Sequence, residues 1–129
     1  MDGLNIDEII ERTVNRTVLK LKMTGLIKDH EKPATAKTEV LLLNYRIFKS
    51  SDQPYTRRIT GKVETALNGI RSDPYYSIIP MFYFDGISRE EIADSFGVTP
   101  TTISRNKSRL LQRLTTELFS DDVITEIFL

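Results

Sequence analysis

The chain has 129 residues, of which 40% are hydrophobic and 28% charged, and its formal net charge is zero. These values are typical of one soluble globular domain, with or without a helical arm, and exclude a polycation that binds nucleic acid indiscriminately. The sequence has no cysteine, no apolar run long enough to span a membrane and no basic-then-apolar leader. We therefore expect a cytoplasmic protein without disulfides, thiolate metal sites or membrane contact.

Residues 6–24 predict an amphipathic helix that Asn5 caps and Gly25 ends. Apolar residues recur along it every three or four positions: Ile6, Ile10, Val14, Val18 and Leu21. Its charges change from acidic to basic along the chain, as the helix dipole favours. The apolar stripe fits either packing against the rest of the chain or a dimerisation helix, and the sequence leaves both open.

A linker is predicted over Gly25–Ala36, where Pro33 lies among mixed charges. It holds His30, the only histidine, which has no other His or Cys with which to bind a metal. A second helix is predicted over residues 39–48, apolar over a wide arc. Most of that arc is expected in the core, and the remainder fits a surface for another subunit or a partner protein.

A turn over Ser50–Tyr55 and a third helix over Thr56–Ile70 are predicted next. The core stripe of this helix is expected to be Ile59, Val63, Ala66, Leu67 and Ile70. Basic residues cluster at its start, where the helix dipole disfavours cations: Arg57, Arg58 and Lys62. These three residues could contact phosphate, or they could form a solubilising face.

The most apolar segment follows. Asp73 and Pro74 predict the start of a helix that continues to Phe84 and bends at Pro80, because proline removes one backbone donor. Its aromatic residues have no basic residues between them, which favours packing in the core over stacking on bases. We expect this helix at the centre of the core, where it supports the two helices that follow it.

The stretch from Ser88 to Leu114 predicts a short helix, a glycine turn and a longer basic helix. Ser88 and Glu91 have the spacing of a capping box, in which each side chain bonds the backbone N–H of the other residue. Gly97 is placed to end the short helix, because glycine adopts the left-handed backbone conformation without a Cβ penalty.

The second helix of this stretch has its own start signals. Thr99 can cap it, and Pro100 falls at its first position, where the missing N–H costs nothing. Val98 and Ile103 are spaced as a hydrophobic staple across that cap. Two helices joined by such a turn describe a helix-turn-helix, whose second helix enters the major groove of double-stranded DNA.

The residue types of the second helix suit that role. It carries four basic residues and no acidic one over residues 99–114: Arg105, Lys107, Arg109 and Arg113. Its apolar residues Ile103, Leu110 and Leu114 fall on one face, so hydroxyls and cations are left for phosphates and base edges. Groove contacts are predicted for Thr101, Thr102, Arg105 and Arg109, phosphate contacts for Ser88, Arg89 and Lys107, and further DNA contacts for Thr99, Ser104 and Ser108.

The run YYSIIPMFYFDGISREEIADSFGVTPTTISRNKSRLLQRL resembles region 4 of a sigma factor. In that module a helix ending in an aromatic–acidic–Gly turn precedes S-x-E-E-I-A, then G-V-T, and then a basic helix that closes on Leu. Upstream, TEVLLLNYRIFK over Thr38–Lys49 resembles the L-L-x-N-Y-R segment of phage regulators of the ArpU/RinA type. Lys107 stands where the sigma pattern usually has an apolar residue.

This resemblance covers most of the chain and implies a phage or prophage transcriptional regulator, typically an activator of late genes, in the bacterial cytoplasm or nucleoid. Its partners would be double-stranded DNA and, as a further expectation, RNA polymerase, and it could act as a dimer. One alternative is a DNA-packaging recognition subunit, like the small subunit of a viral terminase, which would form a ring. Another is a sigma-like module that acts mainly through RNA polymerase, which the zero net charge favours.

The sequence therefore predicts an all-α fold in four segments. They are an N-terminal arm over residues 1–30, a helical middle over 31–72, a helix-turn-helix domain over 73–118 and an acidic, apolar tail over 119–129. Ser120 and Asp121 predict a cap for a final short helix. The apolar C-terminus fits folding back on the core or docking on another subunit.

No catalytic constellation is found in the sequence. His30 has no nucleophile at a recognisable spacing, and the six glycines are scattered turn residues, not a phosphate-binding loop. The carboxylate pairs Glu90–Glu91 and Asp121–Asp122 are explained by a helix cap and an exposed tail. We expect no enzymatic activity, no cofactor and no metal.

Overall fold

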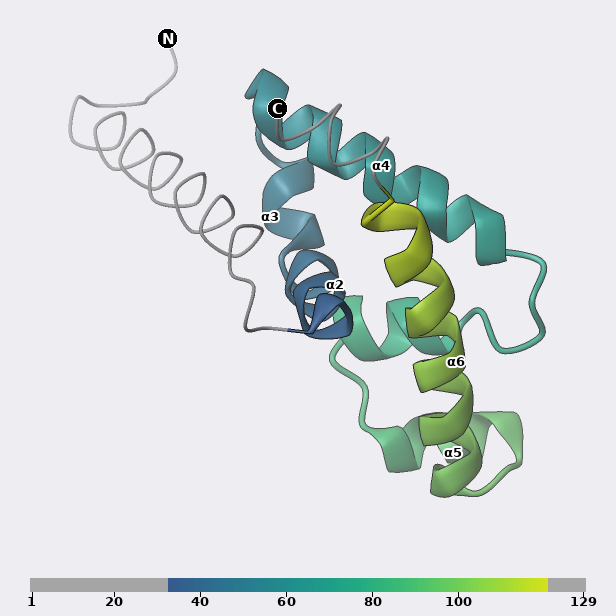
Figure 1. The fold of residues 1–129 in the computed structure, drawn as a ribbon. Helices are drawn as coiled ribbons and strands as arrows, with labels where there is room; N and C mark the ends of the chain where they lie inside the picture. Colours follow the sequence, from purple (N-terminus) through teal and green to yellow (C-terminus); the bar gives the residue numbers. More distant parts are fainter. Residues whose placement is uncertain (1–32, 121–129) are drawn as a thin grey trace, which may run out of the picture. The chain divides into compact units, whose positions relative to one another are not determined.

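A computed structural model describes residues 33–120, and all the regular structure in them is helical. The elements are α2 (Ala34–Leu43), α3 (Tyr45–Lys49), α4 (Pro54–Ile70), η1 (Pro80–Phe84), α5 (Arg89–Phe96) and α6 (Pro100–Leu118) (Figure 1). The all-α class is confirmed. The predicted helix over 6–24, His30 and the tail from Asp121 lie outside the described residues.

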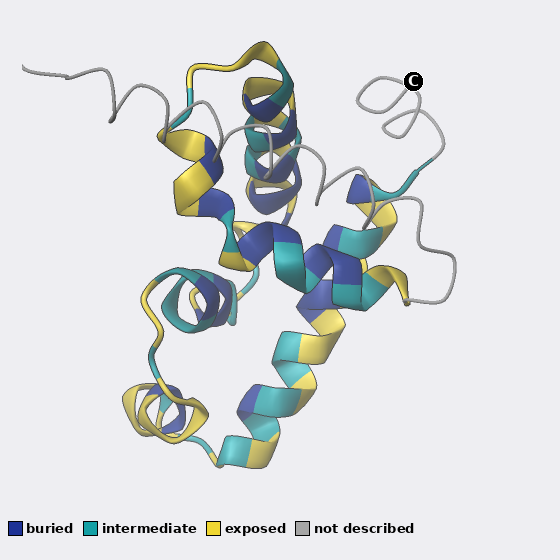
Figure 2. Ribbon diagram, turned by 90° about the vertical axis from the view of Figure 1, so that its left-hand side faces the viewer, coloured by how far each residue is buried: buried dark blue, intermediate teal, exposed yellow. Residues whose placement is uncertain are grey.

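The longest of the described helices, α6, packs against α2, α4 and α5. Buried and exposed residues alternate along it (Figure 2), and its buried side consists of Ile103, Leu110, Leu111, Leu114 and Leu118. The inward face predicted from Ile103, Leu110 and Leu114 is therefore confirmed. The helix continues four residues past the predicted end at Leu114, because Leu118 extends the same apolar spacing onto the core.

The second helix begins earlier than predicted. α2 starts at Ala34, inside the predicted linker, and Pro33 is its cap residue. The Pro33 carbonyl accepts from the Lys37 N–H at 3.2 Å. Proline suits the start of a helix as well as a loop, so its presence did not mark a linker here. The buried Thr38 hydroxyl then bonds that of Thr115 on α6 at 2.7 Å.

A break at Asn44 separates α2 from α3, where one helix was predicted. The Asn44 backbone departs from α-helical geometry, with φ −101° and ψ 6°, and both its N–H and its side-chain amide donate to the Val40 carbonyl, at 3.1 and 2.8 Å. Leu42 and Phe48 are fully buried, whereas Leu43 and Ile47 are 59% and 55% exposed. The predicted division of this apolar arc into a core part and a surface part is confirmed.

The third helix matches its prediction closely. α4 starts two residues early, with Pro54 in its first turn, so the predicted turn ends before Pro54. All five expected core residues are buried: Ile59, Val63, Ala66, Leu67 and Ile70.

The aromatic segment is not the helix that was predicted from Asp73 to Phe84. Residues 71–77 form turns in which the N–H groups of Tyr76, Ile78 and Ile79 donate to carbonyls three residues earlier, at 3.0–3.1 Å. A single π-helical turn, η1, follows and closes with an N–H of Asp85 donating to the Pro80 carbonyl at 3.0 Å.

Two side-chain effects account for this difference. The Asp73 carboxylate accepts from the Tyr75 N–H at 2.9 Å, which stabilises a turn in place of a first helical turn. Pro80 then has no N–H with which to continue an α-helix. The expected core position is nevertheless confirmed, because Ile78 is fully buried against Ile92, Ala93 and Ile103.

Candidate nucleic-acid interface

The first helix of the predicted motif, α5, has the start and stop that the sequence indicates. The Ser88 Oγ accepts from the Glu91 N–H at 3.1 Å. Among the described contacts the Glu91 carboxylate makes no return bond to Ser88, so the capping box is half present. Gly97 ends α5 with φ 68° and ψ 33°, and its N–H donates to the Asp94 carbonyl at 3.2 Å.

The start of α6 also follows the prediction. Thr99 is the cap residue, and its Oγ1 accepts from the Thr102 N–H at 3.2 Å, with Pro100 at the first helical position. Val98 and Ile103 pack into one small core with residues of α5 and of the aromatic segment, which confirms the staple. Turn 97–99 therefore joins two helices that share a core, and this core fixes the position of α6 relative to α5.

The outward face of α6, defined here as Thr101, Arg105, Ser108 and Gln112, is exposed along its length. These residues recur every three or four positions, so their side chains lie in one row. Arg105 makes no ion pair or hydrogen bond with any part of the chain that the structure describes. Gln112 was not among the predicted DNA-binding residues, although its spacing from Arg105 and Ser108 places it in the same row.

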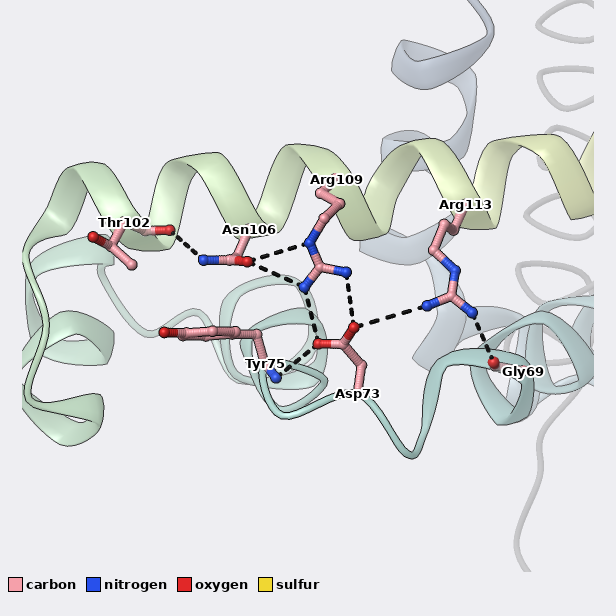
Figure 3. Close-up of polar contacts among 7 residues, drawn as sticks. All are labelled: Gly69, Asp73, Tyr75, Thr102, Asn106, Arg109 and Arg113. Atoms are coloured by element: carbon pink, nitrogen blue, oxygen red, sulfur yellow. Dashed lines mark hydrogen bonds and ion pairs between the residues drawn. The ribbon is translucent and has the colours of Figure 1, made fainter.

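The flank of α6 beside the outward face is bound to the turn that follows α4 (Figure 3). Arg109 donates to both carboxylate oxygens of Asp73, from Nη1 at 2.8 Å and from Nη2 at 3.0 Å. Its Nε and Nη2 also donate to the Asn106 Oδ1 at 3.3 and 3.1 Å, and the Asn106 amide donates to the Thr102 carbonyl at 2.9 Å. Arg113 donates to the Gly69 carbonyl at 3.3 Å and lies 3.8 Å from Asp73.

Electrostatics in this network follow from the same contacts. The hydrogen bonds from Arg109, and then the Tyr75 N–H, lower the pKa of Asp73 to about 2, because they stabilise the carboxylate. The same pairing raises the pKa of Arg109. Asp73 and Asn106 were not among the predicted site residues, because no local pattern in the sequence connects Asp73 with an arginine 36 positions away.

The predicted phosphate-binding residues on α5 lie beside α6. Arg89 donates to the Ser104 Oγ at 3.1 Å and pairs with Glu90 at 3.3 Å, and its side chain is half exposed. Ser88 is exposed at the start of α5, where its hydroxyl already serves as the cap. Arg89 and Ser104 are thus brought together at the junction of the two helices.

Lys107 lies on the inward side of α6, between Ile103 and Leu110. Its Nζ lies 3.9 Å from the centroid of the Phe82 ring and 5.9 Å from that of Tyr83. A cation over an aromatic face is attracted by the ring, so this position favours packing over a phosphate contact. The contact also explains how a lysine is accommodated on the inward side of α6.

The basic cluster of α4 is far from these residues. Arg57 and Arg58 are exposed and Lys62 is half-buried at the start of α4. In Figure 1 that start lies at the upper end of the described helices, and the turn between α5 and α6 lies at the lower end. The structure therefore does not bring this cluster together with the outward face of α6.

Within residues 33–120 no group of three or more His, Cys, Asp or Glu residues could hold a metal ion. No helix among them is long and apolar enough to cross a membrane. The chain matches no protein-family model, no curated protein and no solved structure.

Proposed function

We propose that this protein is a sequence-specific DNA-binding transcriptional regulator whose α6 enters the major groove. The observation that carries the proposal is the outward face of α6, where Arg105, with no ion pair or hydrogen bond within residues 33–120, lies in a row of exposed hydroxyl and amide side chains. The other side of that helix is occupied by core packing. In a helix-turn-helix the second helix reads base edges with its N-terminal residues, which here include Thr101 and Arg105.

Each residue type has a role in this arrangement. Arg105 can donate two hydrogen bonds to the O6 and N7 atoms of one guanine, and Thr101 and Ser108 can bond to several bases. Arg89, together with the hydroxyls of Ser88 and Ser104, is placed at the edge of the helix pair, where phosphates would lie. Such phosphate contacts would fix the register of α6 without reading sequence.

The narrower proposal is a phage or prophage regulator of the ArpU/RinA type with a sigma region 4-like motif, acting as an activator of late genes. It rests on the resemblance of two segments, and α5, turn 97–99 and α6 have helix boundaries compatible with it. RNA polymerase would then be a partner in addition to DNA.

A second candidate is a sigma-like module that acts mainly by binding RNA polymerase. Leu43 and Ile47 favour it, because both are more than half exposed and lie four residues apart at the junction of α2 and α3. Large apolar side chains on a surface are typical of protein contacts when they adjoin one another. The two candidates are separated by in vitro transcription together with a DNA-binding measurement on the protein alone. A sigma-like module would affect transcription without binding DNA specifically by itself.

The test of the first candidate is selection of bound duplexes from a random DNA pool at two salt concentrations. We expect a shared sequence motif, with affinity that falls steeply as salt rises, since phosphate contacts release counterions. Salt-sensitive binding without a motif would move the assignment to the polymerase-dependent module. No binding at either salt concentration would contradict the DNA-binding proposal.

A further inference from the structure

Three of the four cations on α6 already have partners within the described residues. Arg109 and Arg113 form ion pairs with Asp73, and Lys107 lies over the Phe82 ring. Among the residues that the structure describes, Arg105 alone of the four makes no such contact. The charge that α6 can offer to a DNA backbone is therefore smaller than its sequence indicates.

Asp73 is well placed to hold these arginines. Its side chain is only 11% exposed, and its Oδ1 is anchored by the Tyr75 N–H at 2.9 Å. Oδ1 and Oδ2 then accept the two parallel hydrogen bonds from Arg109 (Figure 3). A DNA phosphate would need the same guanidinium donors, because Arg binds carboxylates and phosphates in the same bidentate geometry.

We propose that Asp73 competes with DNA phosphate for Arg109 and Arg113, and so lowers the non-specific affinity of α6 while Arg105 remains available for reading sequence. This inference rests on the proposed DNA-binding function. Asp73 is a positioning residue in this scheme, since it acts through the arginines and not by contact with DNA. Arg109, which the sequence predicted in the groove, would then contribute little to binding in the wild-type protein.

The competition has a physical benefit for a regulator. Non-specific binding grows with the number of neutralised phosphates, whereas specificity depends on the ratio of specific to non-specific affinity. Holding two arginines on a carboxylate reduces non-specific binding and leaves base contacts from Arg105 unchanged. The bonds through Asn106 keep Arg109 directed along the flank of α6.

The decisive variant is Asp73→Asn in the full chain. Asparagine keeps an oxygen for the Tyr75 N–H but loses the charge that holds Arg109 and Arg113. Affinity for a mixed-sequence duplex is measured by fluorescence anisotropy between about 50 and 200 mM salt, where phosphate contacts dominate. We expect the slope of log affinity against log salt to steepen by about 0.9 for each released arginine, and affinity to rise about three- to tenfold.

Asp85→Asn provides a matched control, because it makes the same change of net charge and removes an exposed Arg–Asp ion pair, with Arg46 at 2.7 Å, that does not involve α6. It should leave the slope unchanged. Arg109→Gln should also have no effect on the slope alone, and should remove about half of the gain when combined with Asp73→Asn. If the role of Asp73 were merely structural, Asp73→Asn would not steepen the slope of log affinity against log salt.

Two results would overturn the inference. One is an Asp73→Asn variant, folded by circular dichroism, whose affinity and slope equal those of wild type or fall below them. The other is a reduced slope for Arg109→Gln in the wild-type background, which needs no Asp73 variant and would mean that Arg109 already contacts phosphate. Absence of duplex binding by wild type and Asp73→Asn alike would instead contradict the proposed function, on which the inference depends.

Discussion

The outward face of α6 and its flank toward the turn after α4 carry the same residue type in opposite situations. Arg105 lies on the outward face with no partner among the described residues, whereas Arg109, one helical turn further along, donates two hydrogen bonds to Asp73. Both arginines are exposed and both belong to one basic helix. The comparison teaches that a cluster of cations in a sequence is not the set of cations available to a partner.

The same helix also separates stability from binding. The apolar residues of its inward side, from Ile103 to Leu118, are buried in the core, whereas the residues of its outward face are exposed. Substitutions on the two sides should therefore affect different measurements.

The largest expected effect is on stability. Ile103→Ala removes a side chain that is 1% exposed and shared by α5, α6 and the aromatic segment. We expect the free energy of unfolding to fall by about 3 kcal/mol, as for other buried large-to-small changes, in urea denaturation. Thr101→Ala, two positions away and exposed, is the control and should change it by less than about 0.5 kcal/mol. Equal losses for both variants would contradict the division of α6 into two sides.

Arg105→Ala should have the next largest effect, and only on DNA binding. Loss of one bidentate base contact is expected to weaken binding to the selected duplex by about 1–3 kcal/mol and to relax preference at one base pair. Arg105→Lys keeps the charge but not the planar fork, so it should retain the salt dependence and lose the base preference. Unchanged affinity and preference in both variants would mean that Arg105 does not read the groove.

Asp73 gives a pH-dependent prediction. Its folded-state pKa is held at about 2 by Arg109, below its unfolded value, so its contribution to stability is full above about pH 4 and is lost as pH falls toward 2. Asp73→Asn should be less stable than wild type by about 1 kcal/mol at neutral pH, because solvent screens a partly exposed pair. That difference should disappear toward pH 2 in urea denaturation. A difference that is constant with pH would show that the ion pair is not its source.

Lys107→Met tests whether a cation on the inward side of α6 contributes to binding. Methionine is similar in length and can pack on Phe82, so we expect a stability change below about 1.5 kcal/mol and an unchanged salt dependence of DNA binding. A slope reduced by about 0.9 would instead support the phosphate contact that the sequence predicted.

The smallest effect is expected for the double substitution of Arg57 and Arg58 by Ala. These residues lie at the start of α4, at the opposite end of the described helices from turn 97–99 (Figure 1). Affinity for the selected duplex should change less than it does for Arg105→Ala. A loss as large as that of Arg105→Ala would establish a second DNA-binding surface.

The α5–α6 region could be predicted residue by residue because its signals are local. The caps at Ser88 and Thr99 bond to backbone groups three residues later, and Gly97 acts through its own φ. Such contacts are set by neighbouring residues before any tertiary packing is considered.

The aromatic segment could not be predicted in the same way. Its turns depend on Asp73, whose other contacts come from Arg109, far along the chain. Pro80 indicated a bend, but hydrophobic spacing alone does not distinguish an α-helix from a set of turns ending in a π-helical turn. The resemblance to the sigma pattern likewise marked Lys107 as a departure from that pattern, without showing that the Phe82 ring lies opposite it.

The most direct test of the account is a nuclear magnetic resonance titration of the isotope-labelled protein with the selected duplex, following the arginine side-chain Nε–H signals. Each arginine is reported separately, so the outward face and the flank of α6 are compared in one experiment. We expect the Arg105 signal to shift strongly and to saturate with the duplex, while the Arg109 signal keeps its position. Shifts at Arg109 and Arg113 with none at Arg105, or a shift confined to Arg46 of α3, would contradict the account.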